Sequence, residues 1–174
     1  PGGPRVWIGA DADKAVERAA RLGDAWFINP HVRTDTLARQ MDIYKAALDK
    51  AGKPFPQTQP LIREMYVAGT RAEAMRRAQP YLEAKYRAYH AWGQDKDMPE
   101  GDDDLSAAYE DLVRDRFIFG SIDEAAEQIA DIARVCGANY LTIPVQWPGM
   151  PHAEAMEQMH ILMEEVIPRA RQAI

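Results

Sequence analysis

The residues best suited to chemistry near the amino terminus are Gly9, Ala10 and Asp11, which lie between a β-branched and aromatic run and an amphipathic helix. Glycine lets a ligand approach the backbone closely, and free amide groups at a helix N-terminus favour a bound anion. The pattern therefore predicts a phosphate cradle. The alternative interpretation is a tight turn in which Asp11 or Asp13 caps the helix, and the Asp11 carboxylate would repel phosphate.

A second polar group follows the next apolar run, where Asn29 and His31 begin a loop. The carboxyl ends of parallel strands meet at one edge of a sheet, where α/β proteins bind their ligands. His31 is a weak candidate for a catalytic acid or base, because imidazole titrates near neutral pH. A single histidine in a loop is more often simply solvated, and no other catalytic residue is predicted.

A third polar group, Gln146 and Trp147, follows the last predicted strand. Side chains alternate between the two faces of a strand, which places Gln146 on the side opposite Leu141, Ile143 and Val145. If those three face a layer of helices, Gln146 faces the ligand side of the sheet. The alternative is a loop fixed by its neighbouring prolines.

Arg63 and Glu64 are charges inside an otherwise strand-like run. Their side chains must point in opposite directions, and we predict a buried pair between arginine and a carboxylate rather than a catalytic role. His152 and His160 are eight residues apart, which is not a spacing typical of metal ligands, so no metal site is predicted.

The elements that must position these residues alternate between apolar runs and capped amphipathic helices. We predict an α/β fold with four parallel strands in sequential spatial order and helices on the outer face, which is part of a (β/α)8 TIM barrel. Residues 93–117 interrupt the alternation and are predicted to be an insertion. On the last helix, one face that carries Met156, Met159, Met163 and Val166 is predicted to face the core. The four strands are expected near residues 6–10, 25–29, 61–68 and 139–145.

Several stretches resemble one family when they are taken in order: the Gly9-Ala10 turn with its A-A-R-L-G-D helix, R-E-M-Y-V-A from Arg63, F-G-S from Phe119, and Q-W-P-G-M-P from Gln146. The chain resembles the luciferase-like flavin-dependent oxidoreductases and monooxygenases, which are (β/α)8 barrels that use FMN or a deazaflavin. The resemblance implies a single domain, residues 1–174, made of barrel strands five to eight.

The resemblance also assigns roles to the residues above. It implies that Gly9, Ala10 and Asp11 bind the cofactor, either FMN or a deazaflavin, and that Asn29, Gln146 and Trp147 contact the substrate or the flavin ring. The complete enzyme would oxidise or reduce a small organic molecule, and the isolated chain would be inactive. Two alternatives stay open: a non-catalytic oligomerisation or binding module, and a barrel enzyme that binds a phosphorylated metabolite.

Composition limits the partners. A formal net charge of −6 without a basic cluster argues against nucleic acid and anionic membranes. One cysteine excludes an internal disulfide, and no apolar run reaches membrane-spanning length, so a cytoplasmic location is expected. Because the first and last strands would have unpaired edges, we expect a homo-oligomer or pairing with a missing N-terminal half.

Overall fold

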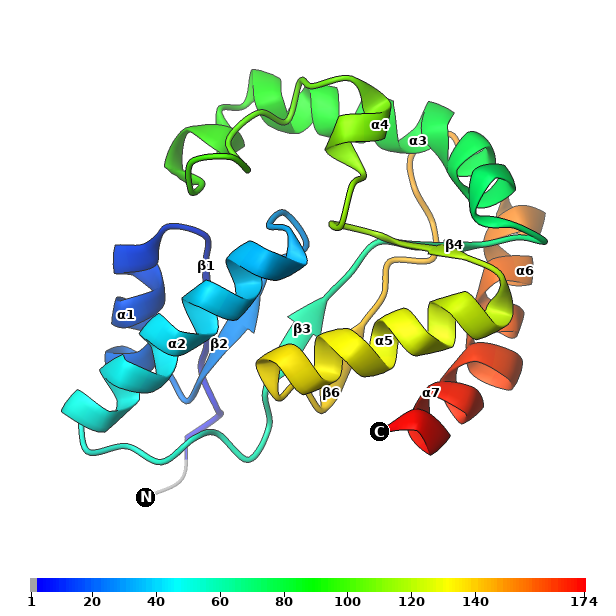
Figure 1. Ribbon diagram of the computed structural model, residues 1–174. Helices are drawn as coiled ribbons and strands as arrows, with labels where there is room; N and C mark the ends of the chain where they lie inside the picture. The colour runs from blue at the N-terminus through cyan, green and yellow to red at the C-terminus, as the bar shows by residue number, and fades with distance from the viewer. Residues whose placement is uncertain (1–2) are drawn as a thin grey trace.

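The fold is built on a four-stranded parallel sheet in the order β1-β2-β3-β6, in a computed structural model that describes residues 3–174 (Figure 1). The parallel pairing and the sequential order confirm the predicted topology. The strands are β1 Trp7–Ala10, β2 Ala25–Ile28, β3 Pro60–Ile62 and β6 Tyr140–Thr142.

Helices cover one face of this sheet. Helix α1 (Asp13–Leu22) packs on α2 (Thr34–Lys50), and α5 (Ile122–Cys136) packs on both α2 and α7 (Ile167–Ala173). In Figure 1, α2 and α5 lie in front of the strands. The last helical stretch consists of three segments that follow one another directly: α6 (His152–Ile161), the π-helical segment η2 (Leu162–Val166) and α7. None of these helices is long and apolar enough to cross a membrane within the described part of the chain.

Helix α5 is capped at both ends. Ser121 and Glu124 form a reciprocal capping box at α5, and Gly137 ends that helix in the left-handed conformation. The alternative interpretation, in which Asp11 or Asp13 caps α1, is wrong, because the N-cap is Ala12 and no side chain caps the helix. Asp13 instead accepts hydrogen bonds from Arg39 and Gln40 of α2.

The third predicted strand, residues 61–68, is divided into two. Arg63 and Glu64 separate β3 from β4 (Met65–Val67), and β4 pairs in parallel with β5 (Ile118–Gly120) in a second sheet. At the break the backbone changes its partner strand: the Arg63 N–H donates to the Thr142 carbonyl oxygen of β6, and the Glu64 carbonyl oxygen accepts from the Ile118 N–H of β5. The last strand is also shorter than the predicted 139–145, since β6 can pair only with the three residues of β3.

The chain leaves the second sheet between β4 and β5. It passes through α3 (Arg71–Ala91), the short 3-10 helix η1 (Gln94–Asp97) and α4 (Tyr109–Leu112) before it returns. The Thr70 side chain caps α3 by accepting a hydrogen bond from the Glu73 backbone N–H, and α3 packs on both β4 and β5. Figure 1 shows α3 and α4 on the side of the molecule towards which the main-sheet strands point. This segment therefore covers the carboxyl ends of the strands.

The two faces of the main sheet differ in burial. Trp26, Ile28 and Leu61 face the helices and are buried. The opposite face carries Trp7 and Tyr140, together with Phe27, and we call it the aromatic face.

The aromatic face is concave. Trp7 and Tyr140 lie on the two outer strands, which would be about 14 Å apart in a flat sheet because adjacent strands are about 4.8 Å apart. Their ring centroids are nevertheless 5.3 Å apart, and the Phe27 ring stacks 6.0 Å from Trp7. The sheet therefore curves towards this face, and Tyr140 is still 50% exposed.

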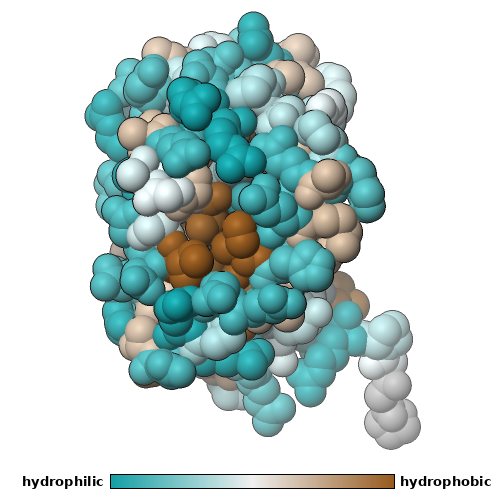
Figure 2. All heavy atoms as spheres, turned by 90° about the vertical axis from the view of Figure 1, so that its right-hand side faces the viewer, coloured by the Kyte–Doolittle hydropathy of each residue, from teal (hydrophilic) through white to brown (hydrophobic). Residues whose placement is uncertain are grey.

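The last helical segments turn a different side to the core than the methionine pattern predicts. Met159 and Met163 are 37% and 59% exposed, so their prediction as core residues is wrong, whereas the prediction for Val166 is confirmed because it is buried. Figure 2, which views the side of the molecule where α6 and α7 lie, shows strongly hydrophobic side chains in a central hollow. The buried positions in these helices are Ala155, Gln158, Leu162, Val166 and Ala170.

Candidate functional site

The carboxyl ends of three strands are joined through Asn29. Its side-chain amide donates to both carboxylate oxygens of Asp11 at 3.2 and 3.1 Å, which links β2 to β1. Arg63, directly after β3, donates from Nη1 to the Asn29 carbonyl oxygen at 3.1 Å. Burial raises the pKa of the Asp11 carboxyl, and the hydrogen bond from Asn29 offsets part of that rise. Two of the predicted ligand-binding residues, Asp11 and Asn29, are thus brought together.

An open pocket of about 430 Å³ lies beside the turn after β1. The exposed side chains of Lys14 and Arg18, on one face of α1, line it. Because Ala12 gives α1 no side-chain cap, the backbone amides of its first turn remain available to a ligand. The pocket suits an anion such as a phosphate. Its other lining residues are Gly9, Ala10, Asp11, Ala12, Ala15 and Asp97.

Glu64 is buried with two partners from distant segments. The Trp147 Nε1–H donates to Glu64 Oε2 at 2.6 Å, and the Lys85 ammonium pairs with Oε1. The prediction that Arg63 pairs with a carboxylate is therefore wrong, because the Arg63 guanidinium has only a backbone acceptor. Glu64 is paired with a lysine instead. Trp147 is buried, and Gln146 beside it is exposed. The structure brings only one of these two predicted contact residues to the strand ends.

A group that sequence patterns did not reveal surrounds Glu154 of α6. The hydroxyl groups of Tyr66 and Tyr81 both donate to its carboxylate, and Arg77 Nη2 lies 3.4 Å away. Both tyrosine rings also stack near Trp147, with centroids 6.1 and 6.4 Å away. These residues come from β4, α3 and α6, so no local spacing in the sequence could have identified them.

His31 is enclosed by aromatic rings. Its ring meets Tyr86 and Tyr89 edge to face, at centroid distances of 5.8 and 5.5 Å. Burial, and then the positive charges of Lys85, Arg116 and Arg63, lower the pKa of His31 to about 4. The imidazole is therefore neutral at pH 7, which makes it a poor proton donor there. Its catalytic role stays a prediction.

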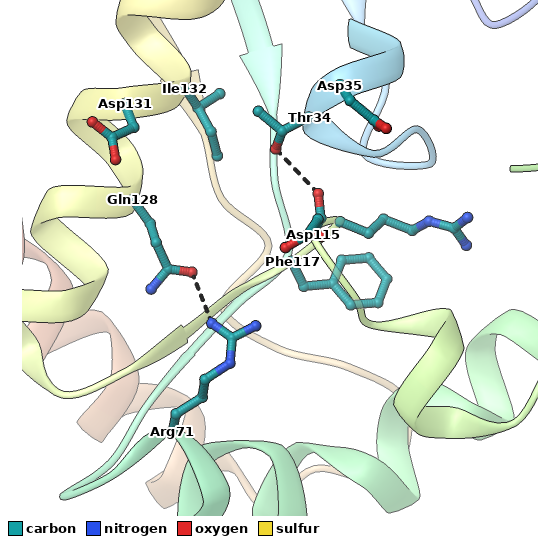
Figure 3. Close-up of a pocket in the computed structure, with 9 residues that line it drawn as sticks. Thr34, Asp35, Arg71, Asp115, Phe117, Gln128, Asp131 and Ile132 are labelled. Atoms are coloured by element: carbon teal, nitrogen blue, oxygen red, sulfur yellow. Dashed lines mark hydrogen bonds between the residues drawn. The ribbon is translucent and has the colours of Figure 1, made fainter. Parts of the chain in front are cut away.

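A second pocket, of about 360 Å³, opens between α2, α3 and α5 (Figure 3). Arg71 points into it and lies 3.5 Å from Gln128 Oε1, while Thr34 Oγ1 donates to the Asp115 carbonyl oxygen. Asp115 has a positive φ of 53°, which is uncommon for a non-glycine residue. Across residues 3–174, no group of three histidine, cysteine or acidic side chains is placed to hold a metal ion.

The parallel sheet and its helices define an α/β protein with a pocket at the carboxyl ends of its strands. A family model described as luciferase-like monooxygenase matches residues 1–139. The chain belongs to this family. No curated protein shows significant sequence similarity to it.

Solved structures share the fold over nearly the whole chain. The monooxygenase RslO1 from Streptomyces bottropensis has 23% identity and a TM-score of 0.67, with 95% of this chain and 48% of that chain covered. The oxygenating constituent of 3,6-diketocamphane monooxygenase from Pseudomonas putida, solved with FMN, has 18% identity and a TM-score of 0.66, covering 95% and 49%. The coenzyme F420 dependent tetrahydromethanopterin reductase from Methanopyrus kandleri has 14% identity and a TM-score of 0.64, covering 94% and 50%.

The chain thus spans about half the length of each of these structures.

Proposed function

We propose that β1, β2, β3 and β6 are strands five to eight of a luciferase-like barrel, and that the complete protein is a flavin- or deazaflavin-dependent monooxygenase or oxidoreductase. The observation that carries this proposal is the pocket beside Gly9 and Ala10, which lies at the carboxyl end of the first strand and is lined by Lys14 and Arg18. Ligands of (β/α)8 enzymes bind at this end of the strands. Relatives solved with FMN or named for coenzyme F420 support the cofactor class.

The residues of this chain would bind and orient the cofactor, while the bound flavin or deazaflavin would supply the redox chemistry. Lys14, Arg18 and the first-turn amides of α1 would hold its phosphate. Asn29 would keep the Asp11 carboxylate turned away from that phosphate, because both carboxylate oxygens accept from its amide. Trp147, fixed against Glu64, would form one wall of the substrate region.

A fluorescence titration tests the cofactor assignment. FMN and the deazaflavin are added separately to the 174-residue chain and to the product of the complete gene. We expect the complete product to bind one of them tightly. We expect the chain alone to bind more weakly than about 0.1 mM, because half of the walls around the ring are missing. Sub-micromolar binding by the chain alone would contradict the partial site, and no binding by the complete product would contradict the cofactor class.

Two variants of the complete product test whether the phosphate of the cofactor binds beside α1. Lys14→Ala and Arg18→Ala should each weaken cofactor binding about tenfold, since each loses a charge-assisted contact. Lys50→Ala, an exposed lysine at the far end of α2, is the matched control and should leave affinity unchanged. Equal affinity in all three variants would place the phosphate elsewhere.

The aromatic face favours a second candidate function, a non-catalytic module that associates through this face. Trp7, Phe27 and Tyr140 form a concave apolar surface, and β1 and β6 each pair on only one side. Such edges are normally covered. Sedimentation of the chain should show a species of about twice 19.6 kDa, and Tyr140→Asp should return it to the monomer. Trp92→Asp, at an exposed residue after α3, is the control. A wild-type monomer at micromolar concentration would exclude this association.

A further inference from the structure

A cluster of buried hydrogen-bond donors without acceptors lies beneath α3. Arg63 is fully buried, and its Nε and Nη2 atoms have no partner among the described residues. Arg116 is 2% exposed, and its Nε and Nη1 atoms also lack partners. The hydroxyl of the fully buried Tyr86 is likewise unpaired. Buried polar groups of folded proteins almost always have partners, so this cluster requires an explanation.

These three residues are neighbours in space. The Tyr86 ring packs 5.1 Å from Phe117, which follows Arg116 directly, and 5.8 Å from His31. His31 lies two residues beyond Asn29, whose carbonyl oxygen accepts the one hydrogen bond of the Arg63 guanidinium. The charges of Arg63 and Arg116 act on each other and on both Tyr86 and His31. The cluster therefore lies at the carboxyl ends of β2 and β3.

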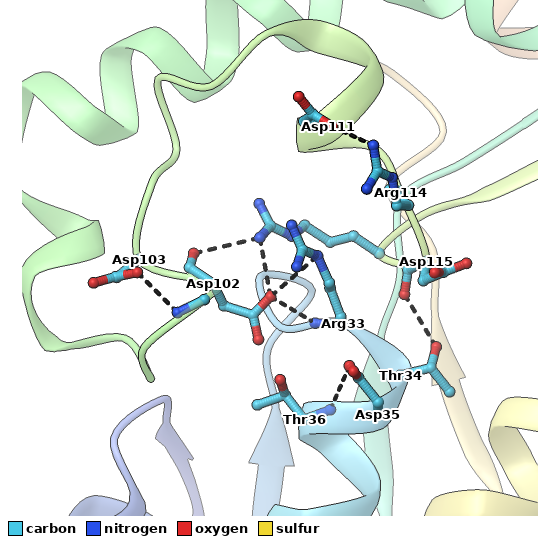
Figure 4. A network of polar contacts seen from close by, with 11 residues as sticks. Arg33, Thr34, Asp35, Thr36, Asp102, Asp103, Asp111, Arg114 and Asp115 are labelled. Carbon is cyan, nitrogen blue, oxygen red and sulfur yellow. Dashed lines mark hydrogen bonds and ion pairs between the residues drawn. The ribbon is translucent and has the colours of Figure 1, made fainter.

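The charges of the cluster do not balance. Lys85 is paired with Glu64, and Arg116 donates to Asp102 at 3.1 Å. Figure 4 shows Asp102 with Arg33 beside its carboxylate. Arg33, with a side chain that is 31% exposed, also approaches Asp102 and reaches solvent. Arg63 has no carboxylate partner. The buried carboxylates of Glu64 and Asp102 are thus paired with Lys85 and Arg116, and the positive charge of Arg63 remains uncompensated.

The Arg63 guanidinium keeps its charge at neutral pH. Burial lowers its pKa to about 10, three units above neutrality. An isolated buried charge is costly, and an arginine side chain has donors only. A water molecule both donates and accepts, whereas an anion only accepts. The unpaired acceptors nearby are Asp102 Oδ2 and, in one tautomer of the neutral ring, His31 Nδ1. The five unpaired donor atoms of Arg63, Arg116 and Tyr86 outnumber them, and this excess of donors favours an anion.

We propose that Arg63, with the Tyr86 hydroxyl and the free nitrogens of Arg116, forms a buried binding site for one small monovalent anion. The charge count sets the valence, because one uncompensated positive charge remains. Burial limits the size of the anion, because the free nitrogens are inaccessible to solvent. The class that fits is a halide or a small carboxylate such as formate. This site is separate from the pocket beside Gly9, and it does not depend on the proposed cofactor.

Thermal unfolding of the 174-residue chain tests the proposal. Sodium gluconate, with an anion too large to enter, is replaced stepwise by sodium bromide or sodium formate at constant ionic strength. We expect the midpoint to rise saturably, by about 3 to 6 °C at saturation. Arg63→Met should abolish this rise, whereas Arg114→Met, at a side chain that is 61% exposed, should preserve it. A wild-type midpoint that does not respond to either anion would overturn the proposal.

A structural measurement keeps the test independent of the stability of the Arg63 variant. Crystals of the unmodified chain grown in sodium bromide are measured at the bromine absorption edge. We expect an anomalous peak within hydrogen-bond distance of the Arg63 guanidinium. Electron density for water alone at that position, without an anomalous peak, would show that the donors are hydrated rather than bound to an anion, and the proposal would be wrong.

Discussion

The indole nitrogen of Trp147 donates a 2.6 Å hydrogen bond to Oε2 of Glu64, although 83 residues separate them in the chain. Glu64 lies in the break between β3 and β4, and Trp147 lies in the loop after β6. Both side chains are buried, and Lys85 of α3 holds the other carboxylate oxygen. The loop after the last strand is thereby attached to the point at which the chain leaves the main sheet.

Trp147→Phe should therefore destabilise the protein while keeping the aromatic packing against Tyr66 and Tyr81. The buried Glu64 carboxylate would lose a charged hydrogen bond, which costs about 1.5 to 3 kcal/mol of unfolding free energy. Urea denaturation followed by circular dichroism measures the change. Trp92→Phe is the control, because Trp92 is 71% exposed and should change stability by less than about 0.5 kcal/mol. Equal effects of both substitutions would show that the hydrogen bond contributes nothing.

Stability should depend on pH through His31. Its pKa is about 4 in the folded protein and about 6.5 in the unfolded chain, so the unfolded chain takes up a proton first as pH falls. The contribution of His31 to the free energy of unfolding is fully present above pH 6.5. It is lost as pH falls towards 4, by up to about 3 kcal/mol.

Denaturation series between pH 4 and 7 measure this loss. His31→Asn should flatten the dependence in that window. His160→Asn replaces a histidine whose side chain is 63% exposed and should leave the dependence unchanged. Parallel curves for the unmodified protein and the His31 variant would mean that His31 titrates normally.

Gln158 supports the small sheet from outside. Its side-chain amide accepts from the Val67 backbone N–H at 2.8 Å and donates to the Val67 carbonyl oxygen at 3.0 Å. Gln158→Leu should leave both backbone groups unpaired and cost about 2 to 5 kcal/mol. Chemical denaturation measures the loss, with Gln172→Leu at an exposed position as the control. A Gln158→Leu protein as stable as the control would show that water replaces the amide.

Gly120 has little space for a side chain. A Cβ atom there would lie 2.7 Å from Glu124 Cβ, and its φ of 157° disfavours other residues. Gly120→Ala should cost about 1 to 3 kcal/mol, because the start of α5 would have to move. Gly3→Ala, where nothing lies within 4 Å, should be neutral. Thermal unfolding compares them, and a stable Gly120→Ala protein would show that α5 shifts freely.

The topology of the main sheet could be predicted from the sequence because its signals are local. Each of its strands is a short apolar run, and each parallel crossover carries a helix of recognisable period. The capping box at Ser121 is equally local. Such patterns depend on residues within a few positions of one another, so they survive without any knowledge of the tertiary structure.

The features that sequence reasoning missed depend on distant partners. Strand β5 is three residues long and exists only because it pairs with β4, although the run Phe117 to Phe119 was an available apolar signal. Gln158 is buried because its side-chain amide bonds to the Val67 backbone. Met163, on the same helical stretch, is exposed. Arg63 and Glu64 were expected to involve a charge pair, but which charge is paired depends on Lys85. The roles of Gly9, Asn29 and Gln146 in ligand binding stay predictions.

The ring contact between Trp7 and Tyr140 makes the two ends of the aromatic face different. Both residues begin their strands, so the rings, with Phe27 against them, fill the amino-terminal end of the curve. The opposite end of this face carries Gly9, Asn29, Ile62 and Thr142, and none of these side chains is aromatic. A molecule that reaches into the curve from the loop side can therefore go no deeper than these three aromatic side chains.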